Sequence, residues 1–357
     1  MASNAYVNKI ATAVPSYEVN SFFLRFAASM LPDDDPRRKK LFGRMIKATG
    51  IERRYSCFAP ASDPDSASVD LDGVFVKGAF PGTAVRMKAY EKAAPGLAET
   101  AVEKLLVGEE RQLITHLIVT SCTGFSAPGI DLELVARCGL SPSVERTIIG
   151  FMGCYAAISA LKMARHIVRS DPNARVLIVN IELCTLHLVE TQDLEKLLSF
   201  CLWGDGCAAS IVSAEPYGLE LERFRALVDR DSQELMSWRI DNSGFDMVLS
   251  GQVPAAIQRT LIASCDDILN GRRPAEIALW AVHPGGRSIL DAVQNALELD
   301  PNALSASREV LRLNGNMSSA TIMFVMEEAL KAPSGLLGCG MAFGPGLTME
   351  TLTFRTV

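Results

Sequence analysis

Apolar runs of strand length alternate with amphipathic stretches of helix length from about residue 97 onward. The segment 97–107, just after Pro95, has helical apolar spacing, and ITHLIV (114–119) has the length of a buried strand. The series continues with a helix over 131–137, a strand over RTIIG (146–150), a helix over 154–168 and a strand over RVLIVN (175–180). Such alternation is typical of a layered α/β protein.

The same pattern starts again after Pro216. It predicts strands over 219–224 and 277–282 and helices over 253–269, 287–297 and 318–330. LIVTSCTG (117–124) and ALWAVHPG (278–285) are each an apolar strand running into a polar, glycine-containing loop. We therefore predict a duplicated α/β architecture with halves 1–213 and 214–357. Because no flexible or stiff linker separates the halves, we expect them to pack together and to share a site at their junction.

Composition narrows the function classes. The chain has 357 residues, 48% of them hydrophobic, and 35 Lys and Arg against 41 Asp and Glu give a net charge of −6. This balance argues against a general nucleic-acid binder. The first 20 residues do not resemble a secretory signal, and no apolar run reaches the roughly 20 residues of a membrane span, so we expect a cytoplasmic protein.

Cysteine usage fits a reducing compartment. The nine cysteines are an odd number without any C-x-x-C pair, which favours free thiols over a disulfide framework. Cys184 and His187 form one C-x-x-H pair. A metal site needs further ligands that the sequence does not offer at matching spacing, so we expect no metal.

Cys154, in GFMGCYAA, is the first candidate for chemistry. A strand-like segment delivers it through a glycine to the first turn of a predicted long helix. The positive end of a helix, together with a cationic neighbour, lowers the pKa of a thiol and favours the nucleophilic thiolate. The alternative is that Cys154 is one more small buried hydrophobic residue.

His283 and Asn316 are the natural partners for such a nucleophile. His283 follows a predicted strand in AVHPGG, and Asn316 lies in NGNMSSATI. A neutral histidine can pair with a thiol, and an asparagine amide can share a developing oxyanion. The alternatives are a structural histidine and a helix N-cap.

Five segments together carry a family resemblance. GFMGCYAA, LWGDGCAAS, AVHPGG, NGNMSSATI and GMAFGPGLTME resemble the type III polyketide synthases, the chalcone and stilbene synthase superfamily, and the match extends along essentially the whole chain. The resemblance implies a thiolase fold, an α/β duplication in five layers (α/β/α/β/α), and a homodimer. It also implies acyl-CoA and malonyl-CoA as substrates and no metal, flavin or nicotinamide cofactor.

The resemblance also implies roles for individual residues. Cys154 accepts the starter acyl group, and His283 and Asn316 activate it and stabilise the enolate formed when malonyl-CoA loses carbon dioxide. Arg44 aligns with a coenzyme-binding arginine of the family, and Lys40 and Lys47 lie one position from its two lysines. A solvated helix face is the alternative for this basic cluster.

Further positions bear on the substrate cavity. Trp203 and Met247 stand where the family usually has a pair of gating phenylalanines, and Trp238 stands where plant members carry glycine. Ala127 replaces a methionine that many plant members project across the dimer. The remaining expected substrate-binding residues are Cys122, Cys184, His187 and Ser318. Ordinary core packing is the alternative for each.

These residues favour one branch of the family. Small side chains at Cys184 and Ala127, with Met247 at the gate, favour a fatty acyl-CoA starter and an alkylpyrone or alkylresorcinol product. The alternatives are a synthase of tetrahydroxynaphthalene or phloroglucinol type that uses malonyl-CoA alone, a carrier-protein-dependent ketoacyl synthase III of fatty acid synthesis, and a non-catalytic thiolase-fold partner subunit.

Overall fold

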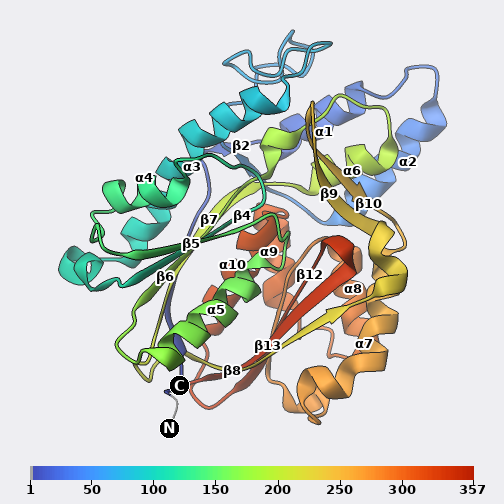
Figure 1. Ribbon diagram of the computed structural model, residues 1–357. Helices are drawn as coiled ribbons and strands as arrows, with labels where there is room; N and C mark the ends of the chain where they lie inside the picture. The colour runs from blue at the N-terminus through green and yellow to red at the C-terminus, as the bar shows by residue number, and fades with distance from the viewer. Residues whose placement is uncertain (1–2) are drawn as a thin grey trace.

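The computed structural model describes residues 3–357 (Figure 1). Its strands are β1 Tyr6–Ala13, β2 Tyr17–Glu18, β3 Tyr55–Ser56, β4 His116–Ser121, β5 Glu145–Gly150, β6 Val176–Leu183, β7 Asp205–Ser213, β8 Leu219–Val228, β9 Met236–Asp241, β10 Gly244–Leu249, β11 Leu279–Val282, β12 Leu337–Gly344 and β13 Thr348–Thr356. Its helices are α1 Asn20–Ser29, α2 Pro36–Thr49, α3 Thr83–Leu105, α4 Ile130–Arg137, α5 Ala156–Ser170, α6 Leu194–Leu202, α7 Val253–Leu269, α8 Arg287–Ala296, α9 Ser305–Asn314 and α10 Thr321–Ala329. Every helix and strand predicted after residue 97 has a counterpart among these elements.

Two half-sheets join into one sheet with the strand order β11-β12-β13-β8-β1-β7-β6-β4-β5. In the first half, β5, β4 and β6 are parallel, and β7 and β1 continue antiparallel. In the second half, β11 and β12 are parallel, and β13 and β8 continue antiparallel. Within the described sheet, the two half-sheets are joined by the pairing of β1 with β8, at Tyr6 with Glu220 and Val7 with Leu219. Each half-sheet therefore combines parallel strands at its outer edge with antiparallel strands toward the junction of the halves.

Five layers result from the way helices cover these half-sheets. Helices α5 and α10 lie between the two half-sheets and share one apolar core with residues of both (Figure 1). Helices α1 and α3 cover the outer face of the first half-sheet, and α7 and α8 cover the outer face of the second. Side chains along β4 point alternately to the two faces of the half-sheet. Leu117 and Val119 belong to the core under α3, and Ile118 belongs to the core that contains α5. The expected five-layered α/β fold is confirmed.

Helix α3 differs from the sequence prediction. A helix starting after Pro95 was expected, but α3 has 23 residues and Pro95 lies inside it. Proline lacks the N–H of a helical hydrogen bond, which usually ends or bends a helix. Here a buried stripe that includes Ala94, Ala98 and Val102 packs the helix against the sheet. None of the helices described in residues 3–357 is both long and apolar enough to cross a membrane.

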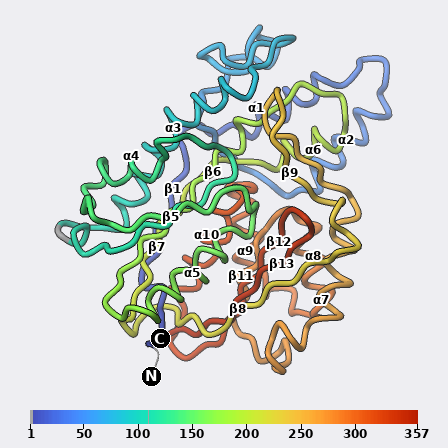
Figure 2. Tube along the Cα trace, viewed as in Figure 1, coloured from blue at the N-terminus to red at the C-terminus, as the bar shows by residue number. Residues whose placement is uncertain are grey.

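A two-stranded hairpin, β9–β10, lies apart from the main sheet. It follows β8 in the second half, yet the trace in Figure 2 runs toward α6 of the first half. An ion pair between Lys196 of α6 and Asp246 of β10 fastens it there. Sequence analysis did not predict this hairpin.

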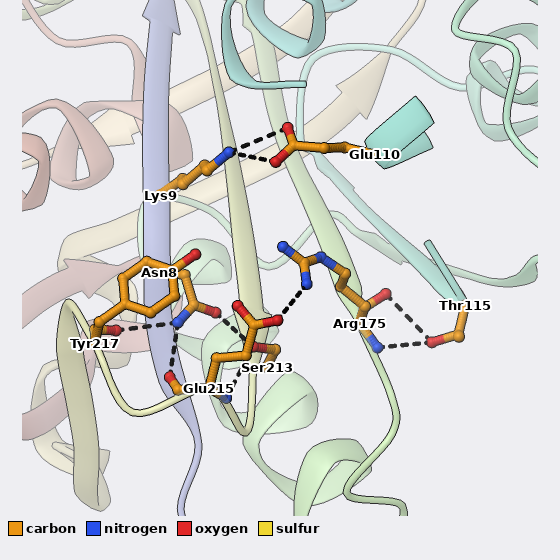
Figure 3. A network of polar contacts seen from close by, with 8 residues as sticks. All are labelled: Asn8, Lys9, Glu110, Thr115, Arg175, Ser213, Glu215 and Tyr217. Carbon is orange, nitrogen blue, oxygen red and sulfur yellow. Dashed lines mark hydrogen bonds and ion pairs between the residues drawn. The ribbon is translucent and has the colours of Figure 1, made fainter. Parts of the chain in front are cut away.

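Polar contacts hold the turn between β7 and β8, which joins the two halves (Figure 3). The Asn8 side chain donates to the carbonyls of Glu215, at 2.9 Å, and Tyr217, at 3.0 Å. Arg175 forms an ion pair with Glu215 of this turn at 2.7 Å. Nearby, within the first half, Lys9 forms an ion pair with Glu110 at 2.8 Å. The halves are thus in firm contact at this turn. The boundary at 213/214 stays a prediction.

Candidate active site

A cavity lies where the two halves meet. Its lining residues come from the loop after β4, the turn before α5, the segments just after β6 and α6, the hairpin and the loops of the second half: Cys122, Thr123, Gly153, Cys154, Cys184, Trp203, Trp238, Met247, Asn316, Ser318 and Pro345. Its open volume is about 40 Å³, enough for no more than a few water molecules. An acyl chain must therefore displace side chains of the wall.

Cys154 reaches this cavity through a tight turn. Strand β5 ends at Gly150, and α5 begins at Ala156, two residues after Cys154. Gly153 has a φ of +80°, and a Cβ there would lie 2.3 Å from Cδ of Pro345. Only glycine fits this turn without strain, so the turn fixes Cys154 at the positive end of α5.

Burial changes the expected electrostatics of Cys154. It raises the pKa of the Cys154 thiol to about 12, and the Glu182 carboxyl adds to this rise, while a hydrogen bond from Ser318 opposes it. Burial lowers the pKa of His283 to about 3. The expectation that the helix start leaves a thiolate is therefore wrong for Cys154 alone. Transfer of its proton to His283 would create opposite charges that stabilise each other.

His283 has the features of a reactive histidine. It follows β11, and its backbone N–H donates to the Met341 carbonyl at 2.8 Å. The side chain is buried, yet neither ring nitrogen has a hydrogen-bond partner among the described residues. Buried polar atoms are almost always bonded, so these free nitrogens point to a ligand or a reaction partner. His283 itself does not line the cavity.

Asn316 connects the loop of His283 to the wall of the cavity. Its Nδ2 donates to the carbonyl of Gly285 at 3.2 Å, and its Oδ1 accepts from the Ser318 N–H at 2.9 Å. Its backbone accepts from the Gly204 N–H at 3.0 Å and donates to the Leu202 carbonyl at 2.8 Å. These bonds fix the amide orientation and leave the second Nδ2 hydrogen free to meet a substrate oxygen.

The expected cavity residues fall into two groups. Cys122, Cys184, Trp203, Trp238, Met247 and Ser318 all line the cavity with Cys154. The rings of Trp203 and Trp238 meet edge to face at 5.5 Å, and Met247 lies opposite Trp238 in the hairpin. His187 is fully buried behind the wall, and Ala127 is exposed beside a separate surface hollow. The structure places neither of them on the cavity wall.

The expected coenzyme-binding residues share one exposed face of α2. Asp35 caps this helix, Pro36 begins it, and Phe42 packs its opposite face against α6. Lys40, Arg44 and Lys47 are exposed and form no ion pair with any described residue. At 100° per residue they lie within about 60° of each other, so their charges point the same way.

Sequence analysis missed Glu182, a buried acid of β6. Its carboxylate accepts from the Cys122 N–H at 2.9 Å, from the Thr123 hydroxyl at 2.9 Å and from the Ser319 hydroxyl. Burial raises the pKa of Glu182 to about 7, and these hydrogen bonds oppose the rise. Glu182 thereby fixes the loop that forms one wall of the cavity. A single acid within the apolar run RVLIVNIEL was the available signal.

Comparisons with known proteins match this architecture along the whole chain. Residues 2–216 match the N-terminal domain of chalcone and stilbene synthases, and residues 225–357 match the C-terminal domain. Bisdemethoxycurcumin synthase of Oryza sativa is 34% identical, over 98% of this chain and 91% of the relative. The alpha-pyrone synthesis polyketide synthase-like Pks18 of Mycobacterium tuberculosis is 32% identical, over 99% of this chain and 91% of the relative.

A solved structure agrees with these matches. The C-terminal type III polyketide synthase domain of Steely1, a type I/III hybrid from Dictyostelium, aligns with a TM-score of 0.89 and 25% identity over 99% of both chains. Fold and sequence thus define a polyketide synthase of the type III class, an acyltransferase with a thiolase-like fold that condenses malonyl-CoA. The chain belongs to the chalcone and stilbene synthase family.

Proposed function

We propose that this synthase loads a medium- or long-chain fatty acyl group from coenzyme A onto Cys154, extends it with malonyl-CoA and closes an alkylpyrone or alkylresorcinol ring. The observation that carries the chemistry is one cavity lined by Cys154 and Asn316, with the Asn316 amide bonded to the carbonyl of Gly285, two residues after His283. Both ring nitrogens of His283 are buried without a hydrogen-bond partner among the described residues. The starter preference is supported by similarity to a mycobacterial relative named for alpha-pyrone synthesis and by the small side chain of Cys184.

Loading begins with a proton transfer. His283 takes the proton of the Cys154 thiol, and the resulting thiolate attacks the carbonyl carbon of the acyl-CoA. The bond to the coenzyme A sulfur breaks, and the leaving thiolate takes the proton back from His283. The starter is then held as a thioester on Cys154.

Extension depends on the two polar donors. When malonyl-CoA loses carbon dioxide, negative charge develops on its thioester oxygen, where the N–H of neutral His283 and the free Nδ2 hydrogen of Asn316 stabilise it. The new carbanion attacks the acyl carbonyl and breaks its bond to Sγ of Cys154. The chain, now two carbons longer, sits on coenzyme A and can be loaded again. Cyclisation of the extended chain ends the sequence.

The coenzyme A phosphates require local positive charge, because the whole chain carries a net charge of −6. The unpaired side chains of Lys40, Arg44 and Lys47 provide it on one face of α2. Ammonium and guanidinium groups bind phosphate through charge-assisted hydrogen bonds. We assign this face to the phosphates of the acyl donor and of malonyl-CoA.

A second copy of the chain completes the proposed assembly. Strand β5 is an edge strand, and its Ile148 is 44% exposed, near the exposed side chains of Phe125 and Met152. Exposed apolar side chains on an open sheet edge are typical of an interface. We infer a homodimer through β5 and a cytoplasmic setting, where free thiols persist. Ile148→Lys should then give a monomer in size-exclusion chromatography with light scattering, whereas an unchanged mass would contradict this interface.

One observation favours a second function. The open volume of about 40 Å³ between Trp203 and Trp238 suits a short starter better than a long alkyl chain. A synthase that builds an aromatic product from malonyl-CoA alone, of tetrahydroxynaphthalene or phloroglucinol type, would need no alkyl tunnel.

One experiment distinguishes the two functions. The purified protein is incubated with malonyl-CoA and acyl-CoA starters from acetyl to stearoyl, and the ring products and the Cys154 adduct are analysed by mass spectrometry. Products that carry the long alkyl chain support the fatty-acyl function. Products made only of malonyl units support the alternative, and absence of any adduct on Cys154 would overturn its role as the nucleophile.

A further inference from the structure

Arg54 is a fully buried arginine beside the end of α6. Its Nε donates to Oδ1 of Asn20 at 2.8 Å, and its Nη1 donates to the carbonyls of Phe200 and, at 2.8 Å, Trp203. A guanidinium is always charged, and burial of a charge is costly even when neutral oxygens accept its hydrogen bonds. The fold thus retains at this position a cost that an apolar residue would avoid.

The two carbonyls that Arg54 binds belong to the last turn of α6 and to its C-cap. The helix ends at Leu202, and Trp203 is the C-cap. The last carbonyls of a helix have no partner within it and carry partial negative charge. The guanidinium satisfies two such carbonyls with a charge of the favourable sign. Arg54 therefore fixes the direction in which the chain leaves α6.

The chain that leaves α6 pairs directly with Asn316. Trp203 and Asn316 form a parallel β-bridge. On one side of Trp203, the Leu202 carbonyl accepts the Asn316 N–H at 2.8 Å, and on the other side the Gly204 N–H donates to the Asn316 carbonyl at 3.0 Å. The main chain of Asn316 is thus held by the residues on either side of the carbonyl that Arg54 binds.

The aliphatic stem of Arg54 also packs against Gly315, the residue before Asn316. Gly315 has a φ of +68°, and a Cβ there would lie 2.8 Å from Cγ and 3.0 Å from Cδ of Arg54. The same Cβ would lie 2.7 Å from the Leu202 carbonyl oxygen. Arg54 therefore contacts the segment of Asn316 directly, as well as through Trp203.

On its other side, Arg54 is fixed to the start of α1. Its carbonyl accepts the Val19 N–H at 2.8 Å. Asn20, which accepts from Nε of Arg54, donates through Nδ2 to the carbonyls of Ile51, at 3.2 Å, and Glu52, at 3.0 Å. The guanidinium is thus oriented by bonds within the first half, while the loop that it supports belongs to the second half.

We propose that Arg54 is a positioning residue that holds Asn316 where its amide meets the enolate formed by decarboxylation of malonyl-CoA. Arg54 does not line the cavity, so it acts through the main chain of 202–204 and through Gly315. Loading of the starter uses Cys154 and His283 and does not need this support. The inference rests on the proposed role of Asn316 as a hydrogen-bond donor to the enolate.

Two substitutions at position 54 and one control test the proposal. Arg54→Met keeps a stem of similar length and removes the guanidinium, and Arg54→Lys keeps the charge but loses the fork of donors. Arg86→Met is the control, because Arg86 is also fully buried and donates from Nη1 to two carbonyls, those of Leu186 and Leu188. These carbonyls belong to the segment after β6 and not to the one that pairs with Asn316.

The measurements are the release of carbon dioxide from malonyl-CoA and the formation of the Cys154 adduct with an acyl-CoA. A misplacement of about 1 Å can lower a rate by about 100-fold. We therefore expect Arg54→Met to lower the kcat of decarboxylation by about 10- to 100-fold with little change in KM and to load Cys154 at nearly the wild-type rate. Arg54→Lys should be intermediate, and Arg86→Met should decarboxylate as the wild type does. A folded Arg54→Met variant with wild-type decarboxylation, or with equal loss of both steps, would overturn the proposal.

A double variant tests whether the effect passes through Asn316. Arg54→Met should add little to the loss of decarboxylation caused by Asn316→Ala, because the two residues act as one unit. A full further loss in the double variant contradicts the proposal. If Arg54→Met does not fold, Arg54→Lys decides, and wild-type decarboxylation by that variant overturns the proposal. Failure of the role of Asn316 itself would appear separately, as undiminished decarboxylation by Asn316→Ala alone.

Discussion

Gly153, from the first half of the chain, lies against Pro345 of the second half so closely that a Cβ on the glycine would be 2.3 Å from the proline Cδ. The neighbouring Cys154 is therefore placed by contact between the halves as well as by its own helix. Gly153→Ala should lose both stability and the Cys154 adduct. A positive φ alone costs about 1–2 kcal/mol for a residue with a Cβ, and the clash adds to this cost.

Gly139→Ala is the matched control for this substitution. Gly139 has a similar φ of +62°, but no atom lies within 4 Å of the position of its Cβ. Urea unfolding of both variants separates the backbone cost from the clash. Equal losses of stability would show that Pro345 exerts no constraint.

His283→Gln should slow alkylation of Cys154 at neutral pH. Without a proton acceptor, the thiol keeps the raised pKa that burial gives it, so the alkylation rate should rise only at higher pH than in the wild type. The measurement is the rate of iodoacetamide modification of Cys154 against pH, followed by peptide mass spectrometry. A superimposable pH profile for the variant would rule out His283 as the acceptor.

Asn316→Ala should separate loading from extension. It removes the N–H donor assigned to the enolate, and loss of one such donor lowers a rate by about 100- to 1,000-fold. Release of carbon dioxide from malonyl-CoA should fall accordingly, while intact-mass measurement still shows the starter on Cys154. Comparable loss of both steps would mean that Asn316 mainly supports the fold of the Gly285 loop.

Glu182 should make stability depend on pH. Its folded-state pKa is raised to about 7 from 4.5, so the folded protein holds a proton that the unfolded chain releases. The free energy of unfolding should therefore fall as pH rises from about 4.5 to 7 and change no further through this group. Asp205, whose pKa burial raises to about 6, acts in the same direction.

Glu182→Gln isolates the contribution of the carboxyl from that of Asp205. Chemical unfolding of the wild type and the variant is compared at pH 5 and pH 7.5. The difference in stability between them should shift in favour of the variant at the higher pH. A difference that does not vary with pH would contradict the assignment.

Arg44→Ala should raise the KM for malonyl-CoA a few-fold, as expected for loss of an ion pair of about 0.5–1 kcal/mol at an exposed site. Lys39→Ala is the control, because Lys39 of α2 is already paired with Asp33, which lies just before the helix. The wild-type KM should also rise with salt. Equal effects of the two variants would argue against a specific phosphate site on α2.

Periodicity predicted much of the fold because the central strands are buried on both faces. ITHLIV and RVLIVN have no polar face, so their apolar runs were recognisable in β4 and β6. The placement of Cys154 just before a helix also followed from the strand, the glycine and the helical pattern around it. Asn316 was likewise found just before a predicted helix, whereas Trp203, Trp238 and Met247 were expected from the family resemblance alone.

The features that sequence analysis missed depend on contacts between residues that are far apart in the sequence. His187 forms hydrogen bonds with the backbone of Thr123 and Phe245, which lie 64 and 58 positions away in the sequence. Every residue has the same backbone groups, so the identity of these two residues gives no sign of the bonds. The pKa of Cys154 depends on how deeply the folded chain buries its thiol. Pro95 was predicted to end a helix because proline removes a hydrogen bond from the helix in which it lies. In the structure, packing of α3 against the sheet offsets this loss, and such packing involves residues distant in the sequence.

The β9–β10 hairpin bears Trp238 and Met247, while Cys154, His283 and Asn316 all come from segments that border the main sheet. Two of the side chains that wall the cavity therefore lie on a segment that carries none of the three residues assigned to the chemistry. Residues 236–249 can thus be exchanged between relatives as one block without replacing Cys154, His283 or Asn316.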